Sequence, residues 1–202
     1  MPYAECVAVQ EAHVRARLGG SPDALLLVEH PPVITLGRRG SMLDVLVAPE
    51  LLASRGIDVQ RSSRGGLVTY HGPGQLVGYP IVHLRGLGLT IPEYAARLER
   101  AVIAALGETG MEAWIDPEHV GVWAAGGKIA AIGIAQRHGV SMHGFAVNLQ
   151  PDMSHFELID PCGISELGVT SAARLLGRTV DPVDFKERIG RALASELGLD
   201  PA

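Results

Sequence analysis

The segment RSSRGGLVTYHGPGQLVGYPIVHL, residues 61–84, constrains the fold of this chain more than any other. Its apolar residues come in short runs, and glycine or proline separates each run from the next. Short runs rich in β-branched and aromatic residues are typical of strands, and Gly-Pro-Gly marks a tight turn. We therefore predict strands joined by turns over residues 57–84, with Tyr70 and His71 at the edge of the YHGPGQ turn.

Two helices are predicted from their end signals. Thr90 and Glu93 have the spacing of a capping box, so a helix should begin there. The last helix should begin after Asp181, with Pro182 in its first position, and Gly198 can end it.

Further elements follow from periodicity and from proline. We expect a helix over residues 4–18 and a short helix over residues 49–54. ALLLVEHPPVITLG should form two strands broken at the Pro31-Pro32 pair, and residues 111–149 should return to strands. The strands form two groups without a regular βαβ rhythm. This pattern predicts an α+β fold, with mixed β-sheets and helices packed on their faces, in a single domain of residues 1–202.

Composition narrows the classes of function. The net charge of −5 argues against nucleic-acid binding. The sequence contains no run of about 18 apolar residues, so we expect no membrane span. The first 20 residues lack the pattern of a signal peptide. The two cysteines, Cys6 and Cys162, are far apart in the sequence, so we expect a reduced, cytoplasmic protein without a disulfide framework.

Lys128 and Cys162 are the candidate catalytic residues. Only two of the 17 basic residues are lysines, and a lysine can give up its proton whereas an arginine effectively cannot. Lys128 follows Gly126-Gly127 in VWAAGGKIAAIGIA, and Cys162 lies between proline and glycine in IDPCGI. Each also has a plain structural interpretation, as a lysine at a strand end and as a small buried thiol.

A lysine beside a cysteine would be enough to activate it. Moving a thiol pKa from about 8.5 to about 6.5 requires roughly 2.7 kcal/mol. An ammonium about 4 Å away supplies a gross Coulomb energy of about 4 kcal/mol at an effective dielectric constant of 20, and desolvation opposes it. The sequence alone does not show that the two residues meet.

The other polar motifs give weaker signals. His143 in SMHGFAVNL is interpreted as a structural histidine, and the adjacent Gly144 would let a ligand approach the backbone. The eight histidines are scattered and there is no Cys-x-x-Cys, so we expect no metal site. The phosphate-binding loop, dinucleotide-binding and nucleophile-elbow motifs do not occur.

Five segments together resemble one known family. RGGLVTYHGPGQLVGYP, GGKIAAIGI, HGFAVNL and PCGI…GVTS occur in the order and approximate spacing found in the lipoyl(octanoyl) transferases, and LLLVEHPPVITLGRRG near the start of the chain also resembles that family. The resemblance covers roughly residues 5–175. It implies a fold shared with biotin protein ligases and lipoate–protein ligases.

The resemblance also implies an activity and a site. An octanoyl (or lipoyl) group passes from acyl carrier protein to a lysine of a lipoyl domain, through an acyl-thioester on Cys162 with Lys128 as its partner, in the first step of endogenous protein lipoylation. No cofactor is needed. The implied substrate-binding residues are Arg64, Gly65, Gly66, Leu67, Val68, Thr69, Tyr70, His71, Ala131, Ile132, Gly133, Gly144, Phe145 and Ala146.

The implied acceptors are the lipoyl domains of 2-oxoacid dehydrogenase complexes and the H protein of glycine cleavage, and we expect a monomer. Arg38, Arg39, Arg61 and Arg64 could form a basic approach for acidic partners. The chain departs from the family at Leu67 and at His83, where an acidic residue is usual.

Two rival functions remain open on the same fold. One is an ATP-dependent lipoate or biotin ligase, which would have no use for a nucleophilic cysteine. The other is a non-catalytic module that binds acyl groups or lipoyl domains.

Overall fold

The computed structural model describes residues 1–160 and 168–199. Its main sheet has six antiparallel strands in the order β1-β5-β9-β8-β7-β6. Their bounds are β1 (Ala24–Val28), β5 (Gln75–Ile81), β6 (Trp114–Ile115), β7 (Val122–Ala124), β8 (Gly127–Arg137) and β9 (Val140–Asn148). The expected return to strands after residue 110 is confirmed, although the first of these strands is only two residues long.

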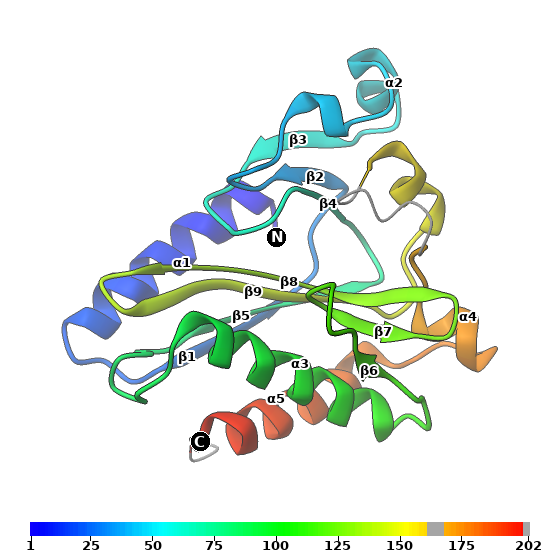
Figure 1. Ribbon diagram of the computed structural model, residues 1–202. Coiled ribbons are helices and arrows are strands. Elements are labelled where there is room, and N and C mark those ends of the chain that lie inside the picture. The colour runs from blue at the N-terminus through cyan, green and yellow to red at the C-terminus, as the bar shows by residue number, and fades with distance from the viewer. Residues whose placement is uncertain (161–167, 200–202) are drawn as a thin grey trace.

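A second sheet of three strands lies beside the first (Figure 1). In it β2 (Val33–Leu36) pairs in parallel with β3 (Asp58–Arg61) and antiparallel with β4 (Val68–His71). It shares a core with α2 (Pro49–Ser54) and with η2 (Met153–Leu158), while η1 (Met42–Asp44) follows β2 in the chain. The α+β prediction is therefore confirmed, and the strands of the glycine-punctuated segment are divided between two sheets.

Helices cover both faces of the main sheet. α1 (Tyr3–Leu18) packs on β5 and β9 from one side, where Cys6 lies fully buried. On the other side α3 (Ile91–Gly107) and α5 (Pro182–Leu197) pack against each other and against the sheet (Figure 1). The short α4 (Ala172–Leu176) precedes α5.

The predicted helix ends are confirmed. The Thr90 hydroxyl accepts the backbone N–H of Glu93, and the Glu93 carboxylate accepts that of Thr90, so α3 begins in a complete capping box. The Asp181 carboxylate caps α5, and Gly198 ends it in the left-handed conformation at φ 67°.

The YHGPGQ turn connects the two sheets. β4 of the small sheet ends at His71, and β5 of the main sheet begins at Gln75. The turn therefore sets where the small sheet lies relative to the large one. Gly74 has φ +82°, and a Cβ atom there would lie 2.4 Å from the carbonyl oxygen of Gln150. Only glycine meets both requirements without strain.

We predict that Gly74→Ala destabilises the protein much more than Gly110→Ala. Gly110 has a similar φ of +89° but open space around it, so alanine there should cost only the left-handed conformation, about 1 kcal/mol. At Gly74 the backbone clash should add about 2 kcal/mol or more. Urea unfolding of both variants measures the difference, and equal losses would show that the close approach to Gln150 costs nothing.

Candidate functional site

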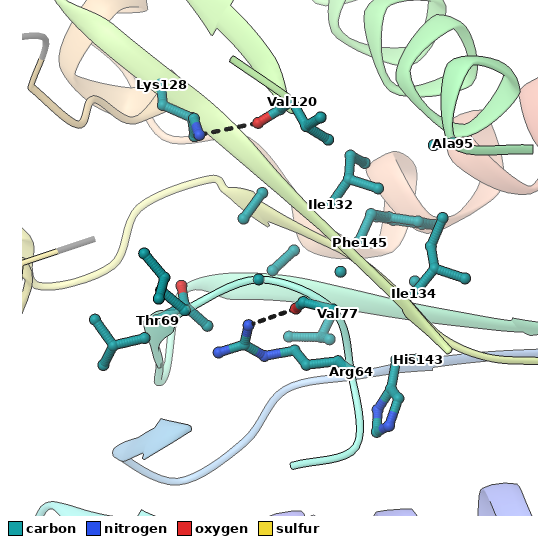
Figure 2. Close-up of a pocket in the computed structure, with 18 of the residues that line it drawn as sticks. Arg64, Thr69, Val77, Ala95, Val120, Lys128, Ile132, Ile134, His143 and Phe145 are labelled. Atoms are coloured by element: carbon teal, nitrogen blue, oxygen red, sulfur yellow. Dashed lines mark hydrogen bonds between the residues drawn. The ribbon is translucent and has the colours of Figure 1, made fainter. Parts of the chain in front are cut away.

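A cavity of about 560 Å³ is lined by residues of both sheets. Lys128 lies near the start of β8, which forms one wall of the cavity. Further along β8, Ile134 pairs with His143 of β9. The six residue steps from Lys128 to Ile134 span about 20 Å of strand. Figure 2 shows the Lys128 side chain directed at Val120, and Arg64 and Thr69 in another part of the lining.

All of the predicted substrate-binding residues except Tyr70 line this cavity, as does the predicted catalytic Lys128. Three separate parts of the sequence supply them. They are Arg64, Gly65, Gly66, Leu67, Val68, Thr69 and His71 from the loop before β4 and from β4; Ala131, Ile132 and Gly133 from β8; and Gly144, Phe145 and Ala146 from β9.

The structure corrects the expected placement of Tyr70. Successive side chains of a strand point to opposite sides, so Tyr70 points away from the cavity that Thr69 and His71 line. It lies in the core of the small sheet, where its ring packs on Phe156 and its hydroxyl bonds His155 Nδ1 at 2.8 Å. Tyr70 therefore supports the turn from behind.

The buried guanidinium of Arg64 joins the loop before β4 to the small sheet. Its Nε and Nη2 atoms donate to the side chain and the carbonyl of Thr35, and its Nη1 donates to the carbonyl of Gly65. The backbone N–H of Gly65 in turn donates to the carbonyl of Ile134 in β8, at 2.9 Å. Leu67 lines the cavity at the position where related chains are expected to carry an acid.

His71 is buried and uncharged. Burial lowers its pKa to about 3, and the nearby Arg64 charge acts in the same direction. Its Nδ1 lies 2.7 Å from Gln75 Oε1, so that nitrogen carries the proton. The amide nitrogen of Gln75 donates to the carbonyl of Tyr70 and to Asn148 Oδ1, so Gln75 ties the turn to β9.

Lys128 is held at the edge of the cavity. Its Nζ donates to the carbonyl of Val120 at 2.9 Å and lies 4.9 Å from the ring centroid of Trp123 (Figure 2). Its backbone N–H donates to the carbonyl of Gly168, and its carbonyl accepts from Thr170. Cys162, the second predicted catalytic residue, lies outside the described residues.

The cavity has walls that the sequence analysis missed. Apolar and aromatic side chains come from α1, β5, α3 and β7, and Glu118, His119 and Val120 come from the loop before β7. These elements give amphipathic or strand-like signals that look the same whether a side chain meets a core or a cavity. The missed apolar and aromatic residues include Tyr3, Val77, Tyr79, Ile91, Ala95 and Trp123.

Absences can be stated for the described part of the chain. Within residues 1–160 and 168–199, no helix is long and apolar enough to cross a membrane. Among the same residues no group of three or more His, Cys, Asp or Glu side chains could hold a metal ion.

Comparison with known proteins gives consistent matches. The sequence family described as "Lipoyl protein ligase A/B catalytic domain" matches residues 2–194. The octanoyltransferase of Desulfotalea psychrophila is 45% identical over 200 residues, covering 97% of this chain and 90% of the relative. The octanoyltransferase of Rubrobacter xylanophilus is 46% identical over 203 residues, covering 99% of this chain and 90% of the relative.

Solved structures share the fold at low sequence identity. A lipoate-protein ligase A bound with ATP superposes with a TM-score of 0.79 at 18% identity, over 96% of this chain and 80% of the other. The biotin protein ligase of Aquifex aeolicus, in complex with biotin and ATP, gives a TM-score of 0.56 at 15% identity, over 81% of this chain and 70% of the other. The expected likeness to lipoate and biotin ligases is thus confirmed at the level of the fold.

The cavity histidine His143 gives a prediction about pH. Burial lowers its pKa to about 4, below the value of about 6.5 in an unfolded chain. Above about pH 6.5 the ring is neutral in both states. As the pH falls from about 6.5 towards 4, the unfolded chain binds a proton that the folded chain excludes, so the free energy of unfolding falls.

We therefore expect His143→Asn to make this loss of stability with falling pH shallower, by up to one proton. Asparagine tolerates the φ of +57° found at this position. Ser63→Ala is the control, because it removes the 2.9 Å hydrogen bond to His143 Nε2 and keeps the titrating ring. It should lower stability without flattening the pH dependence, as measured by urea unfolding from pH 7 to pH 4.5. An unchanged slope in His143→Asn would contradict the prediction.

Proposed function

The chain belongs to the octanoyltransferases of the lipoyl protein ligase A/B catalytic-domain family, and from that membership we propose how it acts. It transfers an octanoyl group in protein lipoylation. The donor is octanoyl-acyl carrier protein, and the acceptor is a lysine of a lipoyl domain, in 2-oxoacid dehydrogenase complexes and in the H protein of glycine cleavage. The protein works as a cytoplasmic monomer and needs no cofactor, because a thioester donor is already activated.

The observation that carries the proposal is the position of Lys128 on an apolar cavity. Apolar side chains such as Val77, Ile132 and Phe145 line it together with the glycines of the loop before β4. Each buried methylene contributes about 0.8 kcal/mol, so the six methylenes of an octanoyl chain could contribute up to about 5 kcal/mol before entropy losses. In this proposal the bound chain presents its thioester carbonyl near the Lys128 ammonium.

The reaction proceeds in two half-reactions on Cys162. The thiolate of Cys162, stabilised by the Lys128 ammonium, attacks the thioester carbonyl of the donor. The carrier thiolate leaves and takes a proton from Lys128, which becomes a neutral amine. The acceptor amine then attacks the acyl-enzyme and gives its proton to Lys128, and Cys162 leaves as a thiolate. The ammonium–thiolate pair is thereby restored.

The structure suggests how the uncharged histidines contribute. Because their pKa values are low, His71 and His143 stay neutral at pH 7 and compete with neither Lys128 nor Cys162 for protons. In this proposal His71 positions the substrate and Lys128 carries the protons.

A covalent intermediate on Cys162 is the first expected outcome. Incubation with octanoyl-acyl carrier protein alone should add the mass of one octanoyl group, and peptide mapping should place it on Cys162. Cys162→Ala should show no adduct and no transfer, with Cys6→Ala as the matched control because Cys6 is buried and does not line the cavity. Full transfer without an adduct, or ATP-dependent transfer in Cys162→Ala, would contradict the mechanism and favour a ligase. Tight octanoate binding with no adduct and no transfer would favour a binding module.

Lys128→Arg should lower the transfer rate by about 100-fold or more. Arginine keeps the positive charge but effectively cannot give up its proton, so acid–base catalysis is lost. Steady-state transfer to a lipoyl domain measures this, with Lys186→Arg as a control on α5. A wild-type rate in Lys128→Arg would show that proton transfer by Lys128 is not required.

A further inference from the structure

The peptide group between Val120 and Gly121 is hydrogen-bonded at both ends. Its carbonyl oxygen accepts from Lys128 Nζ at 2.9 Å, and its N–H donates to Glu99 Oε1 at 2.8 Å. A carboxylate, an amide and an ammonium thus form one continuous chain of hydrogen bonds. Bonds in such a chain polarise one another, so the carboxylate strengthens the carbonyl as an acceptor for the ammonium.

Glu99 is not a solvated residue of a helix surface. It lies on α3 with only 6% of its surface exposed, and burial raises the pKa of its carboxyl group. The N–H of Gly121 and then the charge of Lys128 oppose that rise. A carboxylate is retained in such a place only when it has charged or hydrogen-bonding partners. By contrast Glu108, just after the end of the same helix, forms exposed ion pairs with arginines of α5.

Gly121 sets the direction of this peptide group. Its φ is +126°, and a Cβ atom there would lie 2.7 Å from the carbonyl oxygen of Ala130 and 3.2 Å from Cδ and Cε of Lys128. Any larger residue would push the backbone off β8 or displace the lysine side chain. Glycine therefore allows the lysine to extend along the loop and reach the carbonyl of Val120.

The loop before β7 is also anchored on its other side. Asp116 Oδ1 accepts the backbone N–H groups of Glu118 and His119, and Trp123 Nε1 donates to the carbonyl of His119. The ring of Trp123 lies beneath the Lys128 ammonium. The Val120–Gly121 peptide is thus fixed in place before any ligand arrives.

We propose that Glu99 is a positioning residue for Lys128 and acts on it through the Val120–Gly121 peptide group. This inference rests on the proposed role of Lys128 and adds the group that fixes its amine. The carboxylate favours the protonated lysine until the carrier thiolate takes its proton. The neutral amine can still donate to the carbonyl of Val120, so it stays in place for the second proton transfer.

Other charged and titratable groups surround the relay formed by Glu99, the Val120–Gly121 peptide group and Lys128. Arg100 acts on Glu99 from α3, and the loop before β7 contributes Asp116, Glu118 and His119. Within the described part of the chain, the N–H of Gly121 donates to the Glu99 carboxylate and to none of these side chains. A test must therefore change Glu99 alone and read the lysine itself.

The chain allows such a test because it contains only two lysines, Lys128 and Lys186. Labelling with lysine that carries ¹³C at Cε gives two NMR signals, assigned with Lys186→Arg, and their pH titrations report each amine. Glu99→Gln keeps an oxygen that can accept the N–H of Gly121 and removes the charge. We expect the Lys128 midpoint to fall by about one pH unit, while the Lys186 midpoint stays unchanged. The turnover number kcat should fall about tenfold, with KM for the donor nearly unchanged.

Two further variants complete the design. Glu112→Gln removes an exposed carboxylate and should change neither the Lys128 midpoint nor kcat. Glu99→Asp keeps the charge and should lie closer to wild type than Glu99→Gln in both measurements. It replaces Glu99→Gln in the test if that variant does not fold. A purely structural role would leave the Lys128 midpoint unmoved in Glu99→Gln.

The outcomes separate this inference from the proposed function. If Glu99→Gln changes neither the Lys128 midpoint nor kcat, while Lys128→Arg is inactive, the relay is wrong and the proposed function stands. A lowered midpoint in Glu99→Gln, with Lys128→Arg transferring octanoyl at the wild-type rate, would support the relay and reject the catalytic role of Lys128.

Discussion

The buried guanidinium of Arg64 is the interaction on which the site depends. It binds Thr35 in the small sheet, and the adjacent Gly65 donates to Ile134 at the edge of β8 in the main sheet. One short loop therefore joins the two sheets around the cavity. Charged hydrogen bonds that are kept from water are stronger than exposed ones, which makes this a rigid junction. Its positive charge also helps to keep His71 and His143 neutral.

The site divides its polar groups by position along β8. The neutral histidines lie on the sheet face toward α1, while Lys128 lies near the loop before β7 with a peptide carbonyl and an aromatic ring as neighbours. Between these regions the cavity is lined by apolar side chains such as Val77, Ile132 and Phe145, against which an acyl chain can be buried. In the proposed mechanism this arrangement leaves proton transfer to a single amine.

Much of the secondary structure could be predicted from local signals. The capping box at Thr90, the proline after Asp181 and the glycine at 198 each act within one turn of a helix, and all three are as expected. The motifs also named the part of the cavity wall that comes from β4 with its preceding loop, from β8 and from β9, but they wrongly included Tyr70. Tyr70 points away from the cavity because side chains alternate along β4. Which of the alternating residues face the cavity depends on how β4 pairs with β2, and the motif alone does not contain that pairing.

The sequence by itself determined the family, the α+β class, the helix ends and the glycine-bounded turns, because these depend on residues close together in the chain. Only the tertiary structure decided that YHGPGQ crosses between two sheets, since pairing partners come from distant segments. It alone placed Glu99, which the helical pattern leaves indistinguishable from a surface glutamate, behind the peptide that holds Lys128. Burial and hydrogen-bond partners are properties of the packed chain, and no local pattern of residues contains them.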